Sequence, residues 1–309
     1  MTDTHLPVLL AEALAALNLR PDGIYIDGTF GRGGHAKALL ERLGPHGRLL
    51  ALDRDPDAAR CAAEQFSDDS RFTFVHTPFG RLAEVIDGQG WSSRVNGILL
   101  DLGVSSPQLD DAERGFSFRQ DGPLDMRMDP LHGRSAADWL SRISEAELDR
   151  VLAEYGEERF HRRVARAIVS ARQQTLLTTT AQLAALVATA VPTREPGQHP
   201  ATRTFQAIRI AVNDELGELR TTLPQAVAAL APAGRLAVIS FHSLEDRMVK
   251  QFLREQAKGR ELPLGLPVMG GPEGMTLRLL SRAIRPGAAE VAVNPRARSA
   301  TLRIAERLA

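Results

Sequence analysis

The sequence has a single cysteine, few aromatic residues and no net charge. Cys61 has no partner cysteine in the chain, so an intramolecular disulfide is excluded. Aromatic residues make up 5% of the chain, and 38 basic residues balance 38 acidic ones. The chain as a whole is therefore not basic, and any contact with a polyanion has to come from local clusters of arginine.

Apolar runs of membrane-spanning length are missing as well. No stretch approaches the ~20 apolar residues that a transmembrane helix needs. The first residues, M-T-D-T-H-L-P, lack the basic and then apolar pattern of a signal peptide. Cys61 is predicted to be a small buried residue in a helix. Since the sequence predicts no membrane span, no signal peptide and no intramolecular disulfide, we expect a cytoplasmic protein with no membrane contact.

Glycine, in contrast, is concentrated in one stretch. Residues 24–27 (I-Y-I-D) have the composition of a short strand, and residues 36–43 have that of a helix. Between them lie four glycines: Gly28, Gly31, Gly33 and Gly34. Glycine is needed where the backbone turns sharply or lies against a ligand, since a Cβ would collide there. The order strand, glycine loop, helix predicts a nucleotide-like ligand on this loop.

Two classes of cofactor fit the glycine loop. Residues 31–36 (G-R-G-G-H-A) match the G-x-G-x-x-A form of the dinucleotide fingerprint. They also match the looser loop of S-adenosylmethionine (SAM) enzymes, in which an acid, here Asp27, precedes the glycines. Asp53 ends the next predicted strand, where a carboxylate can accept hydrogen bonds from both ribose hydroxyls of either cofactor. The loop and Asp53 alone leave NAD and SAM open.

Strand and helix signals alternate before residue 135 and after residue 213. Strands are predicted at 24–27, 48–53, 71–76 and 95–101, then at 234–241, 276–280 and 300–304, with the last two as a hairpin pair. Asp55 and Pro56 are typical of an N-cap and a first helical position. The alternation predicts an α/β fold with a doubly wound sheet.

Residues 135–213 carry only helical signals. Ser135 is a predicted N-cap, Ser144 and Glu147 have the spacing of a capping box, and Pro192 ends a helix. Loops are expected at 195–200 and 258–274, which are rich in glycine and proline. We therefore predict one α/β domain formed by residues 1–134 and 214–309, with an inserted helical domain at 135–213.

The segment after the fourth strand separates the two cofactor classes. In open α/β sheets, ligands lie beyond the carboxyl ends of the strands, so residues 101–110 are expected to face the cofactor. Enzymes that methylate exocyclic amines of bases carry a polar-Pro-Pro-aromatic loop here. Residues 105–108 (S-S-P-Q) are similar, with one proline and no aromatic, and Phe116 or Phe118 is the candidate replacement. A NAD-dependent dehydrogenase, the main rival interpretation, leaves this loop without a role.

Longer motifs extend the similarity over the whole chain. They are H-L-P-V-L-L at 5–10, D-G-T-F-G-R-G-G-H at 27–35, D-L-G-V-S-S-P-Q-L-D at 101–110, G-F-S-F-R at 115–119, P-L-D-M-R-M at 123–128, T-F-Q-A-I-R-I at 204–210, I-S-F-H-S-L-E-D-R at 239–247 and N-P-R-A-R-S-A at 294–300. With these motifs the chain resembles the bacterial family of small-subunit ribosomal RNA cytosine-N4 methyltransferases (RsmH or MraW). Motifs this long are far more specific than a glycine loop.

The resemblance implies a fold, a reaction and a set of residues. The fold is a SAM-dependent methyltransferase (Rossmann-like) sheet with an inserted all-helical domain. The reaction moves a methyl group from SAM to N4 of a cytidine in the decoding region of 16S ribosomal RNA, with the small ribosomal subunit as the partner. No metal and no partner protein are implied. The family's cofactor contacts correspond to Gly33, Gly34, His35, Asp53, Phe79, Asp101 and Gln108. Phe79 follows the third predicted strand and is a candidate to stack on adenine, with a core phenylalanine as the alternative. The backbone N–H of His35, at the start of the helix, is expected to face the ligand.

Catalysis on an exocyclic amine calls for hydrogen-bond acceptors aimed at the two N4 hydrogens. We predict the backbone carbonyl of Ser106 as one acceptor, in a turn that Pro107 stiffens through its fixed φ. The Asp101 carboxylate is the candidate for the second acceptor or for the final proton sink, although it can instead serve only to position the methionine part of SAM. Cys61 is not expected to take part.

Contacts with RNA are predicted at three places. His242 follows the fifth strand of the α/β pattern, and Ser243 with Asp246 is the expected cap of the next helix. Arg296 and Arg298 are the candidate phosphate contacts, and residues 159–172, with five arginines and no acid, form a second basic segment. A non-catalytic RNA-binding factor with a vestigial cofactor fold remains the alternative that only a turnover measurement decides.

Overall fold

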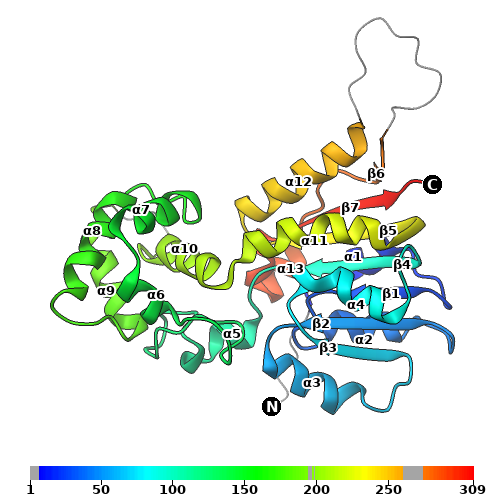
Figure 1. The fold of residues 1–309 in the computed structure, drawn as a ribbon, viewed down its shortest axis with the longest axis horizontal. Helices are drawn as coiled ribbons and strands as arrows, with labels where there is room; N and C mark the ends of the chain where they lie inside the picture. The colour runs from blue at the N-terminus through cyan, green and yellow to red at the C-terminus, as the bar shows by residue number, and fades with distance from the viewer. Residues whose placement is uncertain (1–6, 194–196, 198, 260–273) are drawn as a thin grey trace, which may run out of the picture. The chain divides into compact units, whose positions relative to one another are not determined.

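The structure is a computed structural model that describes residues 7–193, 197, 199–259 and 274–309. Most of the predicted loop at 258–274 and part of the predicted loop at 195–200 lie outside these residues, as does the start of the 5–10 motif. The chain divides into two compact units, one formed by residues 1–103 and 217–309 and one formed by residues 104–216 (Figure 1).

The first unit is built on a seven-stranded sheet with the order β3-β2-β1-β4-β5-β7-β6 (Figure 1). The strands are β1 (Ile24–Asp27), β2 (Arg48–Asp53), β3 (Phe72–His76), β4 (Val95–Asp101), β5 (Leu230–Ser240), β6 (Leu277–Leu279) and β7 (Thr301–Arg307). Strands β1 to β5 are parallel to one another, and β7 runs antiparallel between β5 and β6. The predicted doubly wound sheet is confirmed.

Apolar residues cover both faces of this sheet. One cluster joins the strands to α1 (Leu10–Leu17), α2 (Gly34–Leu40) and α3 (Pro56–Phe66). The other joins them to α4 (Leu82–Gln89), α11 (Glu215–Ala229) and α12 (Ser243–Lys258). In the central strand β4, Ile98, Leu99 and Leu100 are fully buried. A parallel strand covered on both faces is expected to be mainly apolar, as the sequence of β4 is.

Local predictions for the first unit are confirmed in part, and two of them are adjusted. The Asp55 side chain caps α3 by accepting a hydrogen bond from the Asp57 N–H, with Pro56 as the first helical residue. Helix α2 ends at Leu40, three residues before the predicted end. The two last strands pair as predicted, but α13 (Ala288–Val293) and the 3₁₀ helix η3 (Pro295–Ser299) lie between them in the chain, so they are not a simple hairpin.

The second unit is helical, in agreement with the signals in residues 135–213. Its helices are α5 (Ser106–Asp110), α6 (Ala136–Arg142), α7 (Glu145–Glu154), α8 (His161–Arg172), α9 (Thr180–Ala190) and α10 (Thr202–Asn213), with the 3₁₀ helix η2 at Ala112–Arg114. Ser135 caps α6 as predicted. Ser144 caps α7, but the Glu147 carboxylate bonds to Arg150 rather than back to the Ser144 N–H, so the structure records half of the predicted capping box.

The helical unit begins earlier than the predicted boundary at Ser135. Phe116, Leu124 and Met126 are buried in one apolar cluster with the helices of this unit. Pro123 also forms an isolated antiparallel bridge with Thr179. These contacts make residues 104–134 part of the helical unit, because burial of apolar side chains rather than helix content decides which segments pack together.

No helix among the described residues is both long and apolar enough to cross a membrane.

Candidate active site

The glycine loop between β1 and α2 is shaped by close packing as well as by backbone conformation. A Cβ on Gly28 would lie 2.5 Å from Leu100 Cδ2, and one on Gly33 would lie 2.8 Å from the rings of Phe30 and Phe66. Gly33 has a φ of 76°, which side chains rarely adopt. A Cβ on Gly31, in contrast, would meet nothing within 4 Å. The loop is therefore tightly packed at Gly28 and Gly33, while Gly31 leaves open space against its backbone.

Asp53, at the end of the neighbouring strand β2, is joined to this loop by a hydrogen bond. Its Oδ2 accepts a hydrogen bond from the Gly31 N–H at 2.7 Å, and its Oδ1 accepts one from the Asp55 N–H at 2.8 Å. Burial raises the pKa of the Asp53 carboxyl, and these two N–H groups oppose that shift. The Arg54 backbone N–H is a third donor to this carboxylate. A carboxylate has about four acceptor positions, so capacity remains for a ribose hydroxyl, as predicted from the sequence.

Asp27 and Asp101 end the adjacent strands β1 and β4. Asp27 is 1% exposed, and its Oδ1 accepts from the Thr29 N–H at 3.2 Å. The Asp101 N–H donates to the Thr29 hydroxyl oxygen at 2.6 Å, so Thr29 contacts both acids. Asp27 Oδ2 and Asp101 Oδ1 are buried without a hydrogen-bond partner among the described residues. Thr29 was not predicted as a site residue, although its position two residues after a strand-ending acid is a signal that could have indicated it.

The buried setting changes the acidity of both carboxyl groups. Burial raises the pKa of Asp27 to about 7, which the Thr29 N–H opposes and the nearby Asp53 charge reinforces. Burial also raises the pKa of Asp101 well above its usual range, and the charges of Asp27 and Glu245 add to that effect. Strongly perturbed carboxyl groups at the carboxyl ends of parallel strands are typical of a functional site.

His35, in the first turn of α2, is buried and faces protein atoms on both sides of its ring. Its Nε2 lies 3.2 Å from the Val8 carbonyl oxygen, and its Nδ1 lies 3.6 Å from Asp101 Oδ2. From the sequence, the backbone of His35 was expected to meet the cofactor, and its side chain had no definite role. The structure connects that side chain to Asp101.

Phe79 is the first residue of the 3₁₀ helix η1 (Phe79–Arg81), directly after the loop that follows β3. It is half-buried and packs against the apolar cluster on the α4 and α11 face of the sheet. The observed position is compatible with the predicted role of stacking on adenine and also with that of a core phenylalanine, because the side chain is packed on one side while part of it stays accessible.

The segment predicted to distinguish amine methyltransferases forms the start of the helical unit. Ser105 and Gln108 make a capping box for α5: the Gln108 side-chain oxygen accepts from the Ser105 N–H at 2.8 Å, and the Ser105 hydroxyl accepts from the Gln108 N–H at 3.4 Å. Ser106 is the first residue of the helix and Pro107 the second. The structure thus gives the side chain of Gln108, a predicted cofactor contact, a capping role within its own unit.

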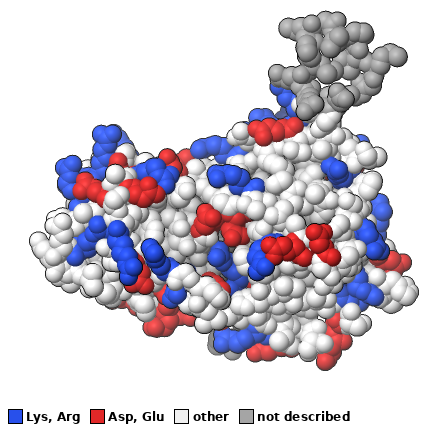
Figure 2. Space-filling view, in the orientation of Figure 1, with Lys and Arg blue, Asp and Glu red and all other residues white. Residues whose placement is uncertain are grey.

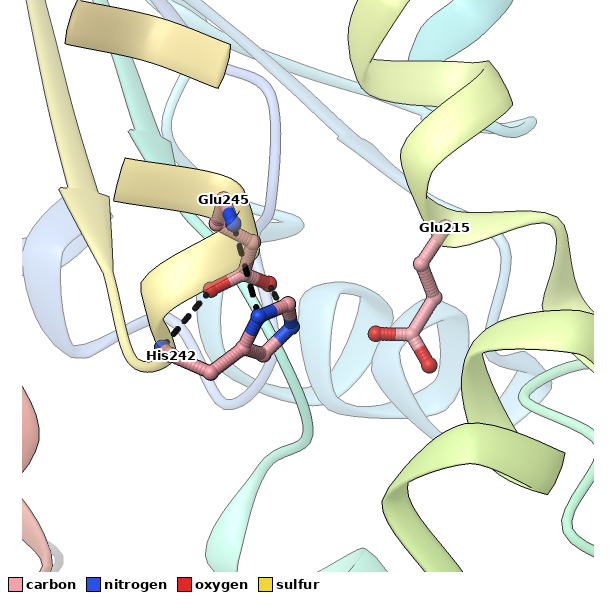
Figure 3. A group of neighbouring side chains, drawn as sticks. All are labelled: Glu215, His242 and Glu245. Atoms are coloured by element: carbon pink, nitrogen blue, oxygen red, sulfur yellow. Dashed lines mark hydrogen bonds and ion pairs between the residues drawn. The ribbon is translucent and has the colours of Figure 1, made fainter. Parts of the chain in front are cut away.

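His242 occupies the N-cap position of α12, and this corrects the prediction that Ser243 with Asp246 caps that helix. The Glu245 N–H donates to His242 Nδ1 at 3.4 Å, and the Glu245 carboxylate accepts from the His242 N–H at 3.3 Å (Figure 3). Asp246 instead binds Arg303 through two hydrogen bonds. Figure 3 also draws Glu215, which belongs to the helical unit and pairs there with Arg209 at 2.7 Å.

The predicted RNA-binding arginines lie in two separate elements. Arg296 and Arg298 are in η3, where Arg298 is exposed. In the helical unit, α8 carries Arg162, Arg163 and Arg166 as exposed residues. Figure 2 shows basic and acidic side chains interspersed over the visible face, in keeping with the neutral total charge.

Comparison with known proteins decides the family. The protein-family model described as "MraW methylase family" matches residues 2–308 of this chain. The chain belongs to the MraW methylase family. Two relatives named "Ribosomal RNA small subunit methyltransferase H" are 65% identical over 99% of this chain and 98% of the protein from Thioalkalivibrio sulfidiphilus, and 59% identical over 100% of this chain and 99% of that from Thiobacillus denitrificans. A third relative of that name, from Nitrosococcus oceani, is 58% identical over 98% of this chain and 97% of its own length.

Membership in this methylase family makes SAM the cofactor and excludes the NAD-dependent dehydrogenase. The residues of the first unit fit such a ligand. Gly31 leaves room against the backbone, and Asp53 retains acceptor capacity for a ribose. The unpartnered oxygens of Asp27 and Asp101 are suited to a ligand that carries a cationic sulfonium.

Proposed function

We propose that this protein methylates N4 of a cytidine in the decoding region of 16S ribosomal RNA, acting on small ribosomal subunits in the cytoplasm. The observation that carries the proposal is the end-to-end match to relatives named ribosomal RNA small subunit methyltransferase H. The choice of N4 rests on the resemblance of the whole set of motifs, and in particular on the S-S-P-Q segment after β4.

The chemistry requires activation of a poor nucleophile. The lone pair of cytosine N4 is delocalised into the ring, and it has to localise on nitrogen as the methyl group arrives. SAM supplies an electrophilic methyl on a sulfonium that departs as a neutral thioether. Groups that accept hydrogen bonds from the two N4 hydrogens favour the more tetrahedral amine, so they stabilise the transition state more than the ground state.

We assign these acceptor roles to the Ser106 carbonyl and the Asp101 carboxylate. Pro107 has a fixed φ and sits in the first turn of α5, which limits the movement of the peptide group before it. Asp101 Oδ1 is buried and accepts no hydrogen bond from the described residues, so this oxygen is available to accept one from a substrate. The high pKa of Asp101 also suits it to receive the proton that N4 loses.

The mechanism needs no covalent intermediate on the protein. Cys61, the single thiol, lies buried in α3 with its sulfur 3.4 Å from the Arg32 carbonyl oxygen and 3.0 Å from Gln65 Nε2. Burial raises the pKa of this thiol, which keeps it protonated and poorly nucleophilic at neutral pH. Direct attack of the exocyclic amine on the methyl group is therefore the simpler route.

For RNA binding we assign Arg296 and Arg298 to phosphate contacts and His242 to a contact with the RNA or the target base. The exposed arginines of α8 are a second candidate for phosphate contacts. Contacts of this kind position the substrate without reading its sequence.

The test is methylation of purified small ribosomal subunits with isotope-labelled SAM, followed by nucleoside digestion and mass mapping of the label. The expected product is N4-methylated cytidine within the decoding region. Label on C5 of cytosine or on another base would overturn the assignment of N4. Binding of subunits without any methyl transfer, with naked 16S ribosomal RNA tested in parallel, would favour the non-catalytic RNA-binding alternative.

A further inference from the structure

The hydrogen bond between His35 and the backbone fixes the position of one imidazole proton. The Val8 carbonyl oxygen can only accept, and it lies 3.2 Å from His35 Nε2. Nε2 therefore carries a hydrogen. In a neutral imidazole, the other ring nitrogen, Nδ1, then has a lone pair and no hydrogen.

That second nitrogen faces a carboxyl group. His35 Nδ1 lies 3.6 Å from Asp101 Oδ2. A lone pair facing an ionised carboxylate at this distance is repulsive, whereas a proton on either group makes the contact attractive. The pair is consequently stable with one proton, either as imidazolium and carboxylate or as neutral imidazole and carboxylic acid.

Asp27 adds a second acid, itself buried, to this pair. It is 1% exposed, its Oδ2 lacks a hydrogen-bond partner in the part of the chain that the structure describes, and Thr29 links it to Asp101. The other charged groups that act on the two acids are Asp53 at the end of β2 and Glu245 in α12, and both are also acidic. His35 is the one basic group in this set, so the cluster without ligand favours bound protons.

We propose that Asp27, Asp101 and His35 distinguish SAM from its product S-adenosylhomocysteine (SAH) by releasing a proton when the sulfonium binds. The inference rests on the assignment of SAM as cofactor and not on the RNA target. SAM carries one positive charge more than SAH because the sulfonium becomes a neutral thioether after methyl transfer. A cation near the cluster favours its deprotonated form, whereas the neutral product leaves the proton in place.

Exchange of a proton for the sulfonium charge has a direct consequence for turnover. Loss of the methyl group removes the positive charge, so the cluster takes up a proton, which the methylated N4 supplies, and its electrostatic attraction to the sulfonium is lost. Product release is thereby coupled to protonation of the cluster. The preference for SAM over SAH rises with pH, by up to about tenfold per pH unit for each proton exchanged, and levels off once the cluster is ionised without ligand.

The test is isothermal titration calorimetry of the full chain with SAM and with SAH at pH 6.5, in buffers of different ionisation enthalpy. The slope of the observed heat against buffer enthalpy gives the number of protons exchanged. The α-amino groups of both ligands are largely protonated at this pH, since such groups titrate near ~8. SAM is expected to release between about 0.5 and 1 proton more than SAH.

Variants assign the exchanged proton. Asp27→Asn keeps the shape of the side chain and should reduce the difference between SAM and SAH by at least half. Glu84→Gln, a matched loss of an exposed carboxylate in α4, should leave the difference unchanged. Equal proton release by both ligands in the unmodified protein would overturn the proposal whatever the variants do.

Nitrogen NMR of the ligand-free protein provides an independent check. The His35 Nε2 signal should remain that of a protonated nitrogen from pH 5 to 9, and a neutral form with the proton on Nδ1 would overturn the proposal. Failure of both ligands to bind would overturn the cofactor assignment together with this inference, whereas binding with equal proton counts would overturn this inference alone.

Discussion

At the scale of single residues, Asp53 combines a structural task with a predicted ligand contact. Asp53→Ala removes the acceptor for the Gly31 N–H and the predicted ribose contacts. We expect SAM affinity to fall by about 1.5–3 kcal/mol, the range for hydrogen bonds to a charged group. Calorimetric titration measures the loss, with Glu84→Ala as the control for removal of an exposed acid. Unchanged SAM affinity would contradict the role of Asp53.

Asp101 is the residue for which binding and chemistry have to be separated. Asp101→Asn should lower the rate of methyl transfer in a single turnover at saturating SAM by about 10²-fold or more, because a transition-state acceptor is removed. Cys61→Ser, placed in α3, should leave that rate unchanged. A normal single-turnover rate combined with weaker SAM binding would show that Asp101 binds the cofactor and takes no part in the chemical step.

At the scale of elements, η3 carries the arginines predicted to meet phosphate. Replacing both Arg296 and Arg298 with alanine should weaken subunit binding and reduce its salt dependence by roughly one unit of slope for each phosphate that an arginine no longer neutralises. SAM affinity should not change. Binding measured over a series of salt concentrations tests this, with the same double replacement at Arg162 and Arg163 as the comparison in α8. If the salt dependence of subunit binding is unaltered, the η3 arginines do not contact phosphate and have only a structural role.

Helix α12 allows a similar separation for His242, which serves as N-cap and is also a predicted RNA contact. His242→Ala should lower stability by about 0.5–2 kcal/mol through loss of the cap. His242→Asn preserves a good capping residue, so it should unfold near the temperature of the unmodified protein. If His242 contacts RNA, the asparagine variant will bind small subunits more weakly than the unmodified protein although its stability is kept. Normal binding of subunits by this variant would show that His242 serves only as the N-cap.

At the scale of the whole molecule, the buried acids make stability depend on pH in an unusual direction. The pKa of Asp27 is raised from 3.8 to about 7, so between these values the folded chain binds a proton that the unfolded chain does not. Its contribution to stability is therefore lost progressively as pH rises from 3.8 to about 7. Asp27→Asn should be more stable than the unmodified protein at both pH 5 and pH 8, with a larger gain at pH 8, of at most about 4 kcal/mol, than at pH 5.

The measurement is thermal unfolding without cofactor at both pH values. Asp69 is the control of opposite sign, because its hydrogen bonds to Arg71 lower the pKa of its carboxyl. Its contribution is present at both pH values, so Asp69→Asn should destabilise the protein at pH 5 and at pH 8. A pH-independent effect of Asp27→Asn would show that this carboxyl is ionised in the folded protein at both pH values, and would contradict the raised pKa.

The sequence alone determined most of the elements and the general chemistry. Apolar runs and turn residues indicated the order of strands, the helical region after Ser135 and the caps at Asp55 and Ser135, because these signals depend on neighbours within one or two turns. The glycine loop and the long motifs pointed to a SAM-dependent methylase, which the family match confirms. The individual site and RNA contacts remain predictions.

Tertiary structure decided the features that depend on residues distant in the chain. The inclusion of 104–134 in the helical unit, the contacts of Thr29 with two strand ends, and the place of His35 between Val8 and Asp101 all come from packing. The cap at His242 involves only residues close in the chain, and it was still predicted wrongly. Its acceptor is an imidazole nitrogen, whereas N-cap prediction relies on the usual preference for serine, threonine, aspartate and asparagine. Burial of Asp27 changes its acidity because desolvation disfavours the charged form, and no sequence pattern specifies how much water a folded chain excludes.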